Sequence, residues 1–211
     1  MNSKAIAAIV AMACFFAGSV VYATPFANGG FELPDISGTF QPQSPPGTLG
    51  NWTVTAGSID LINSYWQPAE GGQSIDLNGL SAGTISQAFD TVIGATYSVT
   101  FALSGSPRNV TGNLATKTLL ASAGNFSDLF NFSDVTNSLT DMKWIDKSFD
   151  FIAQSDTTTL SFTSLESGAV GPALDDVRVD LVSLPVPEPS TFILAGFGLA
   201  GIALLGRRSR T

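Results

Sequence analysis

Histidine is absent from this 211-residue sequence, and its only cysteine is Cys14. These two residue types supply many of the general bases, thiol nucleophiles and transition-metal ligands of proteins. Their scarcity therefore excludes much common catalysis and most zinc or copper sites. Basic residues are also few, since nine Lys and Arg stand against seventeen Asp and Glu, for a net charge of −8. Because phosphate binding needs a basic face, we expect no nucleic-acid partner.

Charged residues make up only 12% of the chain, whereas a soluble domain usually has about 25%. Part of the deficit lies at the N-terminus, where residues 1–23 predict a secretory signal peptide. Lys4 supplies its positive charge, residues 5–21 form its apolar stretch, and Ala23 precedes the cleavage point at Thr24. A membrane anchor that is never cut is the alternative. Cleavage would remove the single thiol, so the mature chain would have no disulfide.

The C-terminus has three parts: a Pro-punctuated segment at 186–190, an uncharged apolar run at 191–206, and a basic end at 207–210. As a hydrophobic helix, the sixteen residues of the run would span about 24 Å, whereas a permanent membrane span needs about 20 residues. The arginines would keep this end on the cytoplasmic side of the membrane. Such an order is typical of sorting signals whose tail is later removed. An ordinary short tail anchor is the alternative.

Residues 24–186 contain 16 acids and 5 bases, a net charge of −11, and alternate between apolar and polar side chains. A period of two predicts half-buried strands, and clusters of Gly, Asn, Pro and Ser separate them at the spacing of a sandwich. We find no helix-period segment of useful length here. The region is therefore predicted to be an all-β, antiparallel β-sandwich, with strands at 52–55, 59–62, 74–77, 84–89, 96–103, 148–152, 159–163 and 176–181.

Two long stretches of this region, residues 34–50 and 104–113, are irregular. Residues 34–50 form a Pro-, Ser- and Gly-rich insertion, and a long loop of this kind is a candidate for function. The Asn-Phe-Ser-Asp sequence at 125–128 recurs at 131–134. We interpret the duplication as a hairpin with matching aromatic contacts rather than as a binding feature.

Several short motifs together resemble one known family. They are Asn28–Glu32, Trp52–Val54, Tyr65–Gln67, Ser74–Gly79, Ile85–Gln87 and Gly171–Val177. With them the region resembles the choice-of-anchor C family, which is related to DUF642-type proteins. The resemblance implies a galactose-binding-like jelly roll in a secreted, surface-associated module, and no settled activity.

The C-terminal motif carries a second resemblance. Pro187, Glu188 and Pro189 lie within a Val-Pro-Glu-Pro-Ser sequence that resembles the PEP-CTERM sorting signal of Gram-negative bacteria. The resemblance implies recognition by an exosortase-type membrane enzyme, transient anchoring in the inner membrane, and delivery to the cell surface or extracellular matrix. The expected organisation is a signal peptide at 1–23, an ectodomain at 24–186 and a sorting segment at 187–211.

The leading hypothesis for function is a non-catalytic surface or matrix protein that binds polysaccharide. Tyr65, Trp66 and Trp144 are the aromatic residues that could stack on sugar rings, whereas Trp52, at a strand start, is expected in the core. This hypothesis depends largely on fold analogy. A purely structural coat or adhesion protein is one alternative. The other is a secreted glycoside-processing enzyme, which needs only a pair of carboxylates, from among Asp60, Glu70, Asp76, Asp141 and Asp146.

A structural calcium ion is also expected. By alternation Asp175 shares the face of Val177 and Val179, which directs its carboxylate inward, where it needs a cation or hydrogen-bond donors. Similar carbohydrate-binding modules hold calcium between an Asn-Gly-x-Phe-Glu glutamate and an Asp-Asp-Val aspartate. That resemblance nominates Glu32 and Asp175, with backbone carbonyls completing the six to eight oxygens that calcium prefers. The other possibility is that both acids accept loop amides or pair with Arg178.

Overall fold

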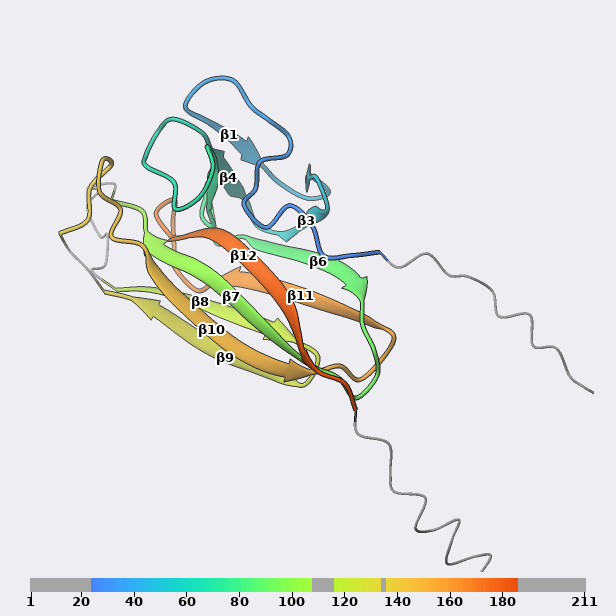
Figure 1. The fold of residues 1–211 in the computed structure, drawn as a ribbon. Helices are drawn as coiled ribbons and strands as arrows, with labels where there is room; N and C mark the ends of the chain where they lie inside the picture. The colour runs from blue at the N-terminus through green and yellow to red at the C-terminus, as the bar shows by residue number, and fades with distance from the viewer. Residues whose placement is uncertain (1–23, 108–115, 134–135, 186–211) are drawn as a thin grey trace, which may run out of the picture.

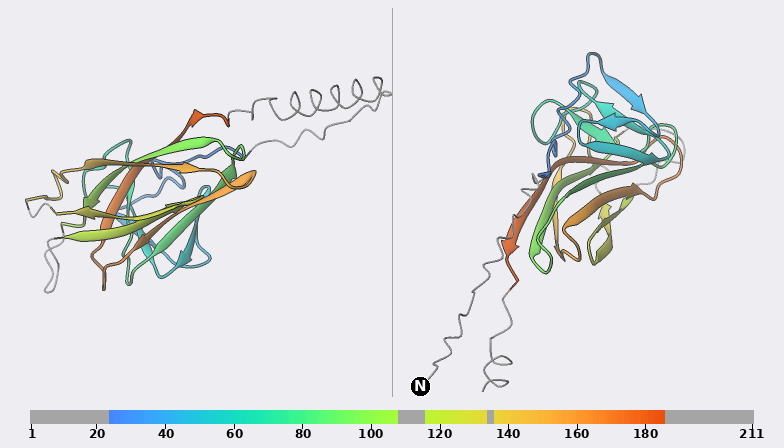
Figure 2. Two further views of the ribbon diagram at one scale, coloured as in Figure 1. Left: turned by 90° about the horizontal axis from the view of Figure 1, so that it is seen from below. Right: turned by 90° about the vertical axis from the view of Figure 1, so that its right-hand side faces the viewer.

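The computed structural model describes residues 24–107, 116–133 and 136–185. Within these ranges the protein is all-β, with twelve strands in two antiparallel sheets that face each other (Figures 1 and 2). The described residues contain no helix long and apolar enough to cross a membrane. The predicted signal peptide, the Pro187–Pro189 motif and the C-terminal apolar run lie outside the described residues.

Each sheet has six strands. The first sheet has the order β1 (Phe40–Gln43), β4 (Ile59–Ile62), β5 (Ser74–Asp76), β12 (Pro172–Ser183), β7 (Thr96–Gly105) and β10 (Ile145–Ile152). The second has the order β2 (Thr48–Leu49), β3 (Trp52–Ala56), β6 (Thr84–Asp90), β11 (Thr157–Ser164), β8 (Lys117–Ala123) and β9 (Phe126–Phe132). The predicted β-sandwich is confirmed, and all eight predicted strands are present.

Four strands were not predicted. Two of them, β1 and β2, lie inside the segment that the sequence marks as an insertion, and β1 is largely exposed and contains Pro42, which hides its pattern. The other two, β8 and β9, form a hairpin. We expected the two copies of the Asn-Phe-Ser-Asp repeat to form a hairpin with each other. They do not. Phe126 and Phe132 of the two copies instead lie in the same strand, β9, because the hairpin partner is β8.

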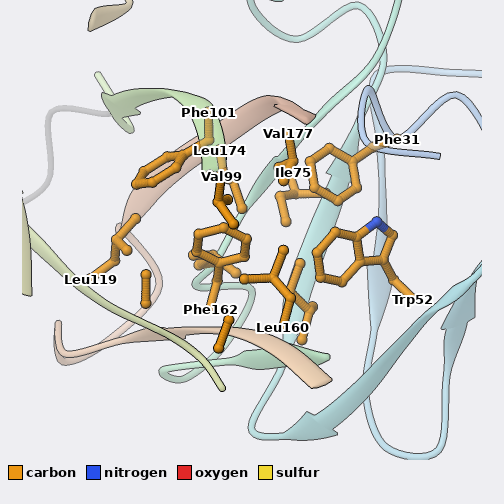
Figure 3. Packing of buried hydrophobic residues seen from close by; sticks show 14 of the residues in the cluster. Phe31, Trp52, Ile75, Val99, Phe101, Leu119, Leu160, Phe162, Leu174 and Val177 are labelled. Carbon is orange, nitrogen blue, oxygen red and sulfur yellow. The ribbon is translucent and has the colours of Figure 1, made fainter. Parts of the chain in front are cut away.

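The core lies between the facing surfaces of the two sheets (Figure 3). Trp52 is fully buried there, with ring centroids 5.6 Å from Phe31 and 6.0 Å from Phe162, as its predicted core position requires. The indole Nε1 donates a hydrogen bond of 3.0 Å to the carbonyl oxygen of Asn28. Buried aromatic rings remove large apolar areas from water. Trp52 therefore anchors the N-terminal segment to the sandwich.

A β-bulge in β12 changes which face its side chains occupy. Asp175 pairs with Ala102 of β7, but Arg178 pairs with Thr100, so β12 contains one extra residue between them. Asp176 is the residue at the bulge with a positive φ, 47°. Such an insertion shifts the alternation by one position. The expectation that Asp175 shares the face of Val177 is therefore wrong: Val177 packs in the core, and Asp175 lies on the outer face.

The outer face of the first sheet is partly covered by the segment that joins β4 to β5, residues 63–73. Asp175 is completely buried beneath this segment, and the backbone N–H groups of Ala69 and Glu70 donate hydrogen bonds to its carboxylate. A second, smaller apolar cluster forms at this covered surface, separate from the main core. Its members are Ile62, Trp66, Met142 and Ala173, with Tyr65 and Trp144 packed against them.

Candidate functional site

A cavity of about 200 Å³ opens on this outer face, at the edge formed by β1, β4 and β5. Its residues come from strands and loops that are far apart in the sequence. The β4–β5 segment supplies two aromatic rings, the strands supply two acids, and the segments after β7 and β11 close one side. The lining residues are Phe40, Asp60, Ile62, Tyr65, Trp66, Asp76, Ser106 and Ala169.

Three aromatic rings form the apolar part of the cavity. The centroid of Tyr65 lies 5.9 Å from that of Phe40 and 5.8 Å from that of Trp66. Trp66 is only 4% exposed, and its Nε1 donates to the Ser74 hydroxyl at 2.8 Å, which fixes the indole as part of the cavity wall. Phe40 is exposed and Tyr65 half-buried, so these two rings are open to a ligand.

Two carboxylates form the polar part. Asp60 and Asp76 are direct cross-strand partners on β4 and β5, so their side chains share the outer face. Asp76 is almost fully buried, and its Oδ1 accepts backbone N–H groups of Asn78 at 2.9 Å and Gly171 at 3.2 Å. Burial raises the pKa of Asp76 to about 7, and the charge of Asp60 adds to the rise, although the hydrogen bonds oppose it.

A buried polar layer lies behind Asp76. Lys117 is almost fully enclosed, and its Nζ donates to the carbonyl oxygen of Val170 at 3.1 Å. Burial lowers the pKa of Lys117, while the charges of Glu166 and Asp76 oppose that shift. Asn78 donates its amide group to the carbonyl oxygens of Glu166 and Gly168. These bonds hold the β11–β12 connection, which supplies Ala169 to the cavity.

A second depression of about 300 Å³ lies further along the same outer face. It is polar and has charges of both signs. Within it the Arg178 guanidinium donates two hydrogen bonds to the Asp176 carboxylate, at 2.9 and 2.8 Å. The residues that line it are Thr100, Phe101, Asp146, Lys147, Ser148, Asp176 and Arg178.

Only two of the three aromatic residues that were predicted to bind sugar lie in the cavity. Tyr65 and Trp66 line the same cavity. Trp144 is not among its lining residues; it packs against the outer-face cluster and donates from Nε1 to the carbonyl oxygen of Gln67 at 3.0 Å. Trp144 therefore holds the β4–β5 segment in place. Phe40 was missed because it lies in the segment that was predicted as an insertion.

The five acids nominated for glycoside chemistry are also separated. Asp60 and Asp76 line the first cavity and Asp146 the second, whereas Asp141 pairs with Lys143. Glu70 lies in the β4–β5 segment. Sequence reasoning had no pairing register for β4 and β5. The sequence did show one acid at a polar position of each strand, and this signal could have suggested that Asp60 and Asp76 lie side by side.

Glu32 and Asp175 hold the same short segment, residues 69–73, by different amides. Glu32 Oε1 accepts the N–H groups of Gly72 and Gln73 at 2.9 and 3.0 Å. Asp175 Oδ2 accepts those of Ala69 and Glu70 at 2.7 and 3.0 Å. Loop amides, one of the partners that the sequence left open, are thus present, whereas Arg178 pairs with Asp176 instead.

The surroundings of Asp175 bear on the predicted calcium site. Burial raises the pKa of Asp175 to about 7, and the charge of Glu70 adds to the rise. A cation here would offset that cost, so the chemistry of the two carboxylates suits calcium. Their geometry suits it less, because a metal ion would have to replace the amide contacts. No group of three or more His, Cys, Asp or Glu side chains placed to hold a metal occurs within the described residues.

The raised pKa of Asp76 predicts a pH-dependent stability. The folded pKa of about 7 exceeds the value of 3.8 expected for an exposed carboxyl, so the stabilising contribution is complete below pH 4 and is lost as the pH rises through 7. Asp76→Asn removes the titration but keeps an acceptor for the two amides. In urea unfolding, wild type should therefore lose stability relative to Asp76→Asn between pH 4 and 7. Parallel profiles would contradict the burial argument, and Asp141→Asn is the exposed control.

Several solved structures of carbohydrate-binding modules are similar in fold to this chain. The structure of TmCBM61 in complex with beta-1,4-galactotriose has 12% sequence identity and a TM-score of 0.47, over 75% of this chain and 99% of that one. A CBM35 from Paenibacillus barcinonensis has 19% identity and a TM-score of 0.43, over 69% of this chain and 100% of that one. The CBM22-1 xylan-binding domain of Xyn10C from the same organism has 17% identity and a TM-score of 0.43, over 68% and 94%.

Sequence comparison finds a curated relative and two family models. Halomucin from Haloquadratum walsbyi is 33% identical in an alignment of 183 residues, which covers 81% of this chain but only 2% of that protein. A PEP-CTERM protein-sorting motif matches residues 185–209, which confirms the predicted C-terminal signal of an exported, surface-sorted protein. The model of DUF642, a protein family of unknown function, matches residues 24–180. The chain therefore belongs to the DUF642 family.

Proposed function

We propose that this protein is a non-catalytic surface or matrix module that binds polysaccharide in the cavity lined by Phe40, Tyr65, Trp66, Asp60 and Asp76. The observation that carries the proposal is the meeting of three aromatic rings and two carboxylates in one concave site. Apolar walls with a few convergent polar groups are typical of sites for small organic ligands. A sugar unit has both an apolar C–H face for the rings and hydroxyl donors for the carboxylates.

The size of the cavity supports a short segment of a polymer as the ligand. About 200 Å³ is less than the roughly 300–1,000 Å³ of pockets that enclose a drug-sized molecule. A single sugar unit would enter, and the rest of the chain would lie along the outer face. The polar depression at Asp146, Lys147 and Arg178 lies on that face and offers it further hydrogen-bonding groups.

Binding is better supported than catalysis. Glycosidase carboxylates must reach the scissile bond from positions about 5–5.5 Å or 6.5–9.5 Å apart. Asp76 is only 4% exposed and is held by two backbone amides, so it is poorly placed to attack a substrate. Asp60, its half-buried partner across the strands, is the more accessible acceptor for a sugar hydroxyl.

The sorting signal supports the proposed location. We propose cleavage of the signal peptide between Ala23 and Thr24, transient anchoring of the apolar run 191–206 in the inner membrane of a Gram-negative bacterium, and processing by an exosortase-type enzyme. In this scheme residues 24–186 are the exported ectodomain, delivered to the cell surface or matrix.

Removing an open ring should weaken glycan binding without unfolding the protein. Tyr65→Ala takes away a half-buried ring of the cavity, and we expect about tenfold lower affinity, equivalent to about 1.4 kcal/mol. Affinity electrophoresis with soluble polysaccharides, including the exopolysaccharide of the producing organism, measures the change. Leu80→Ala alters an exposed residue outside the cavity and should leave retention unchanged. If wild type is retained by no polysaccharide, or if Tyr65→Ala binds as well as wild type, the proposed site is wrong.

Replacing Pro187, Glu188 and Pro189 together by Ala tests the proposed sorting. Because an exosortase-type enzyme would no longer recognise the motif, the protein should be shed or retained in the inner membrane. Cell fractionation with intact-mass analysis measures the location and both processed ends. Normal surface delivery of the triple variant would refute a role for the motif.

We further propose, from the chemistry of the paired acids, that calcium binds at Glu32 and Asp175 in the folded protein. Glu70, near both the Asp175 carboxylate and Gly30, adds negative charge at this position. A hard cation prefers such oxygen ligands, and its charge would offset the burial of Asp175.

Thermal melts in calcium and in EGTA test this site. At one hundred times the dissociation constant, calcium should add about 2.7 kcal/mol to the free energy of unfolding. Glu32→Gln should abolish the calcium-dependent rise in melting temperature, whereas Asp141→Asn, a change at an exposed acid paired with Lys143, should retain it. Equal melting temperatures of wild type in calcium and EGTA would remove the site.

A further inference from the structure

Exposed apolar side chains gather at one end of the sandwich. Val92 and Ile93 lie in the turn between β6 and β7, and Leu181, Val182 and Leu184 lie at the end of β12 and just beyond it. Their exposed fractions range from 47% for Val92 to 61% for Ile93. Single exposed apolar residues are ordinary, but a contiguous group of them marks an interaction surface.

Backbone contacts bring these two segments together. Ser183 of β12 pairs with Thr96, directly after the β6–β7 turn. Gly94 in the turn donates its N–H to the carbonyl oxygen of Ala153 at 2.8 Å. A Cβ built on Gly94 would lie 3.3 Å from Cβ of Pro185. The exposed residues Val92, Ile93, Leu181, Val182 and Leu184, together called the apolar end, therefore lie at the same end of the sandwich.

Both ends of the described chain also leave the sandwich here (Figure 1). Thr24 exchanges hydrogen bonds with Asp90, the last residue of β6, through the backbone N–H of each residue. Pro185 lies beside Gly94. The two apolar segments of the sequence, 5–21 and 191–206, are thus attached at this same end.

The tether to the second of these segments is short. Five residues, 186–190, separate Pro185 from the apolar run. Fully extended, they reach about 17 Å at 3.3–3.6 Å per residue. When the run is inserted in a membrane, the apolar end must therefore lie close to the lipid surface.

Charge favours a neutral surface as the partner. The apolar end adjoins Thr96 and Tyr97, at the start of β7. Four basic residues occur within the described ranges, and all lie away from this end: Lys117, Lys143, Lys147 and Arg178. Asp90 and Asp156, by contrast, flank the β6–β7 turn. Contact would therefore depend on apolar insertion, and anionic headgroups would weaken it.

We propose that the apolar end docks on the lipid–water interface of the membrane that holds the C-terminal run. This orientation has a consequence for the candidate cavity. Ile93 precedes the start of β7, whereas Ser106, which lines the cavity, follows its end. The ten residues of β7 span about 30 Å, so docking would direct the cavity away from the membrane, toward ligands outside.

Fluorescence quenching in vesicles tests the docking. The chain from Thr24 to Thr211, which has no native cysteine, is given one new cysteine that carries a polarity-sensitive probe. It is inserted in phosphatidylcholine vesicles that contain a lipid-attached quencher. A probe at Ile93→Cys should shift to the blue and be quenched several-fold more than one at Leu80→Cys. Leu80 is 82% exposed and lies near the opposite end, in the β5–β6 connection. Because Gly94 lies beside Pro185, the tether alone also brings position 93 near the lipid. The substitutions at Val92 and Leu184 described below therefore separate docking from tethering.

Two further comparisons distinguish a lipid surface from a second copy of the protein as the partner of the apolar end. Replacing part of the phosphatidylcholine by phosphatidylglycerol should reduce quenching at low salt, and added salt should restore it. Substituting Val92→Ser and Leu184→Ser together should reduce quenching at position 93 while glycan retention stays unchanged. Equal quenching at positions 80 and 93, or quenching at position 93 that the double substitution leaves unchanged, would overturn the proposal. A blue shift that appears only at high protein density, without lipid quenching, would assign the surface to a second copy and also overturn it.

Discussion

A β-bulge at Asp176, which has a φ of 47°, adds one extra residue to β12. This bulge decides which side chains of β12 face the core and which face the outer surface. Before it, Leu174 faces the core and Asp175 the outer surface; after it, Val177 again faces the core. An uninterrupted alternation would have put Asp175 among the core side chains. A buried carboxylate without partners is costly there. On the outer face, the carboxylate instead binds the amides of Ala69 and Glu70.

The arrangement of the candidate cavity follows from that contact. Asp175 holds one end of the 69–73 segment, and Glu32 holds the other through Gly72 and Gln73. Gly71 between them has a φ of +58°, and a Cβ on it would lie 2.2 Å from Glu32 Oε1, so a side chain would break the close approach. With the segment fixed, Tyr65 and Trp66 are held above Asp60 and Asp76. A ligand would then meet a preformed surface, at a smaller cost in ordering.

The two ends of the sandwich differ in chemistry. One end joins the predicted membrane-directed segments and exposes aliphatic side chains such as Ile93 and Leu184. The other end, beyond β7, adjoins the aromatic and acidic cavity and the buried layer of Lys117 and Asn78. This polarity is consistent with a surface protein that is attached at one end and binds at the other.

Local patterns were enough to predict the all-β class, eight strands, the buried Trp52 and the sorting motif, because each depends on alternation or on adjacent residues. They also pointed to Tyr65 and Trp66, but not to their meeting with Phe40, which lies across a strand pairing in a segment without alternation. The opposition of Asp60 and Asp76 required the register of β4 with β5. The sidedness of Asp175 required the bulge, since one inserted residue reverses a period of two. Pairing register, bulges and loop closure arise from contacts between segments distant in sequence, and only the folded chain brings those segments together.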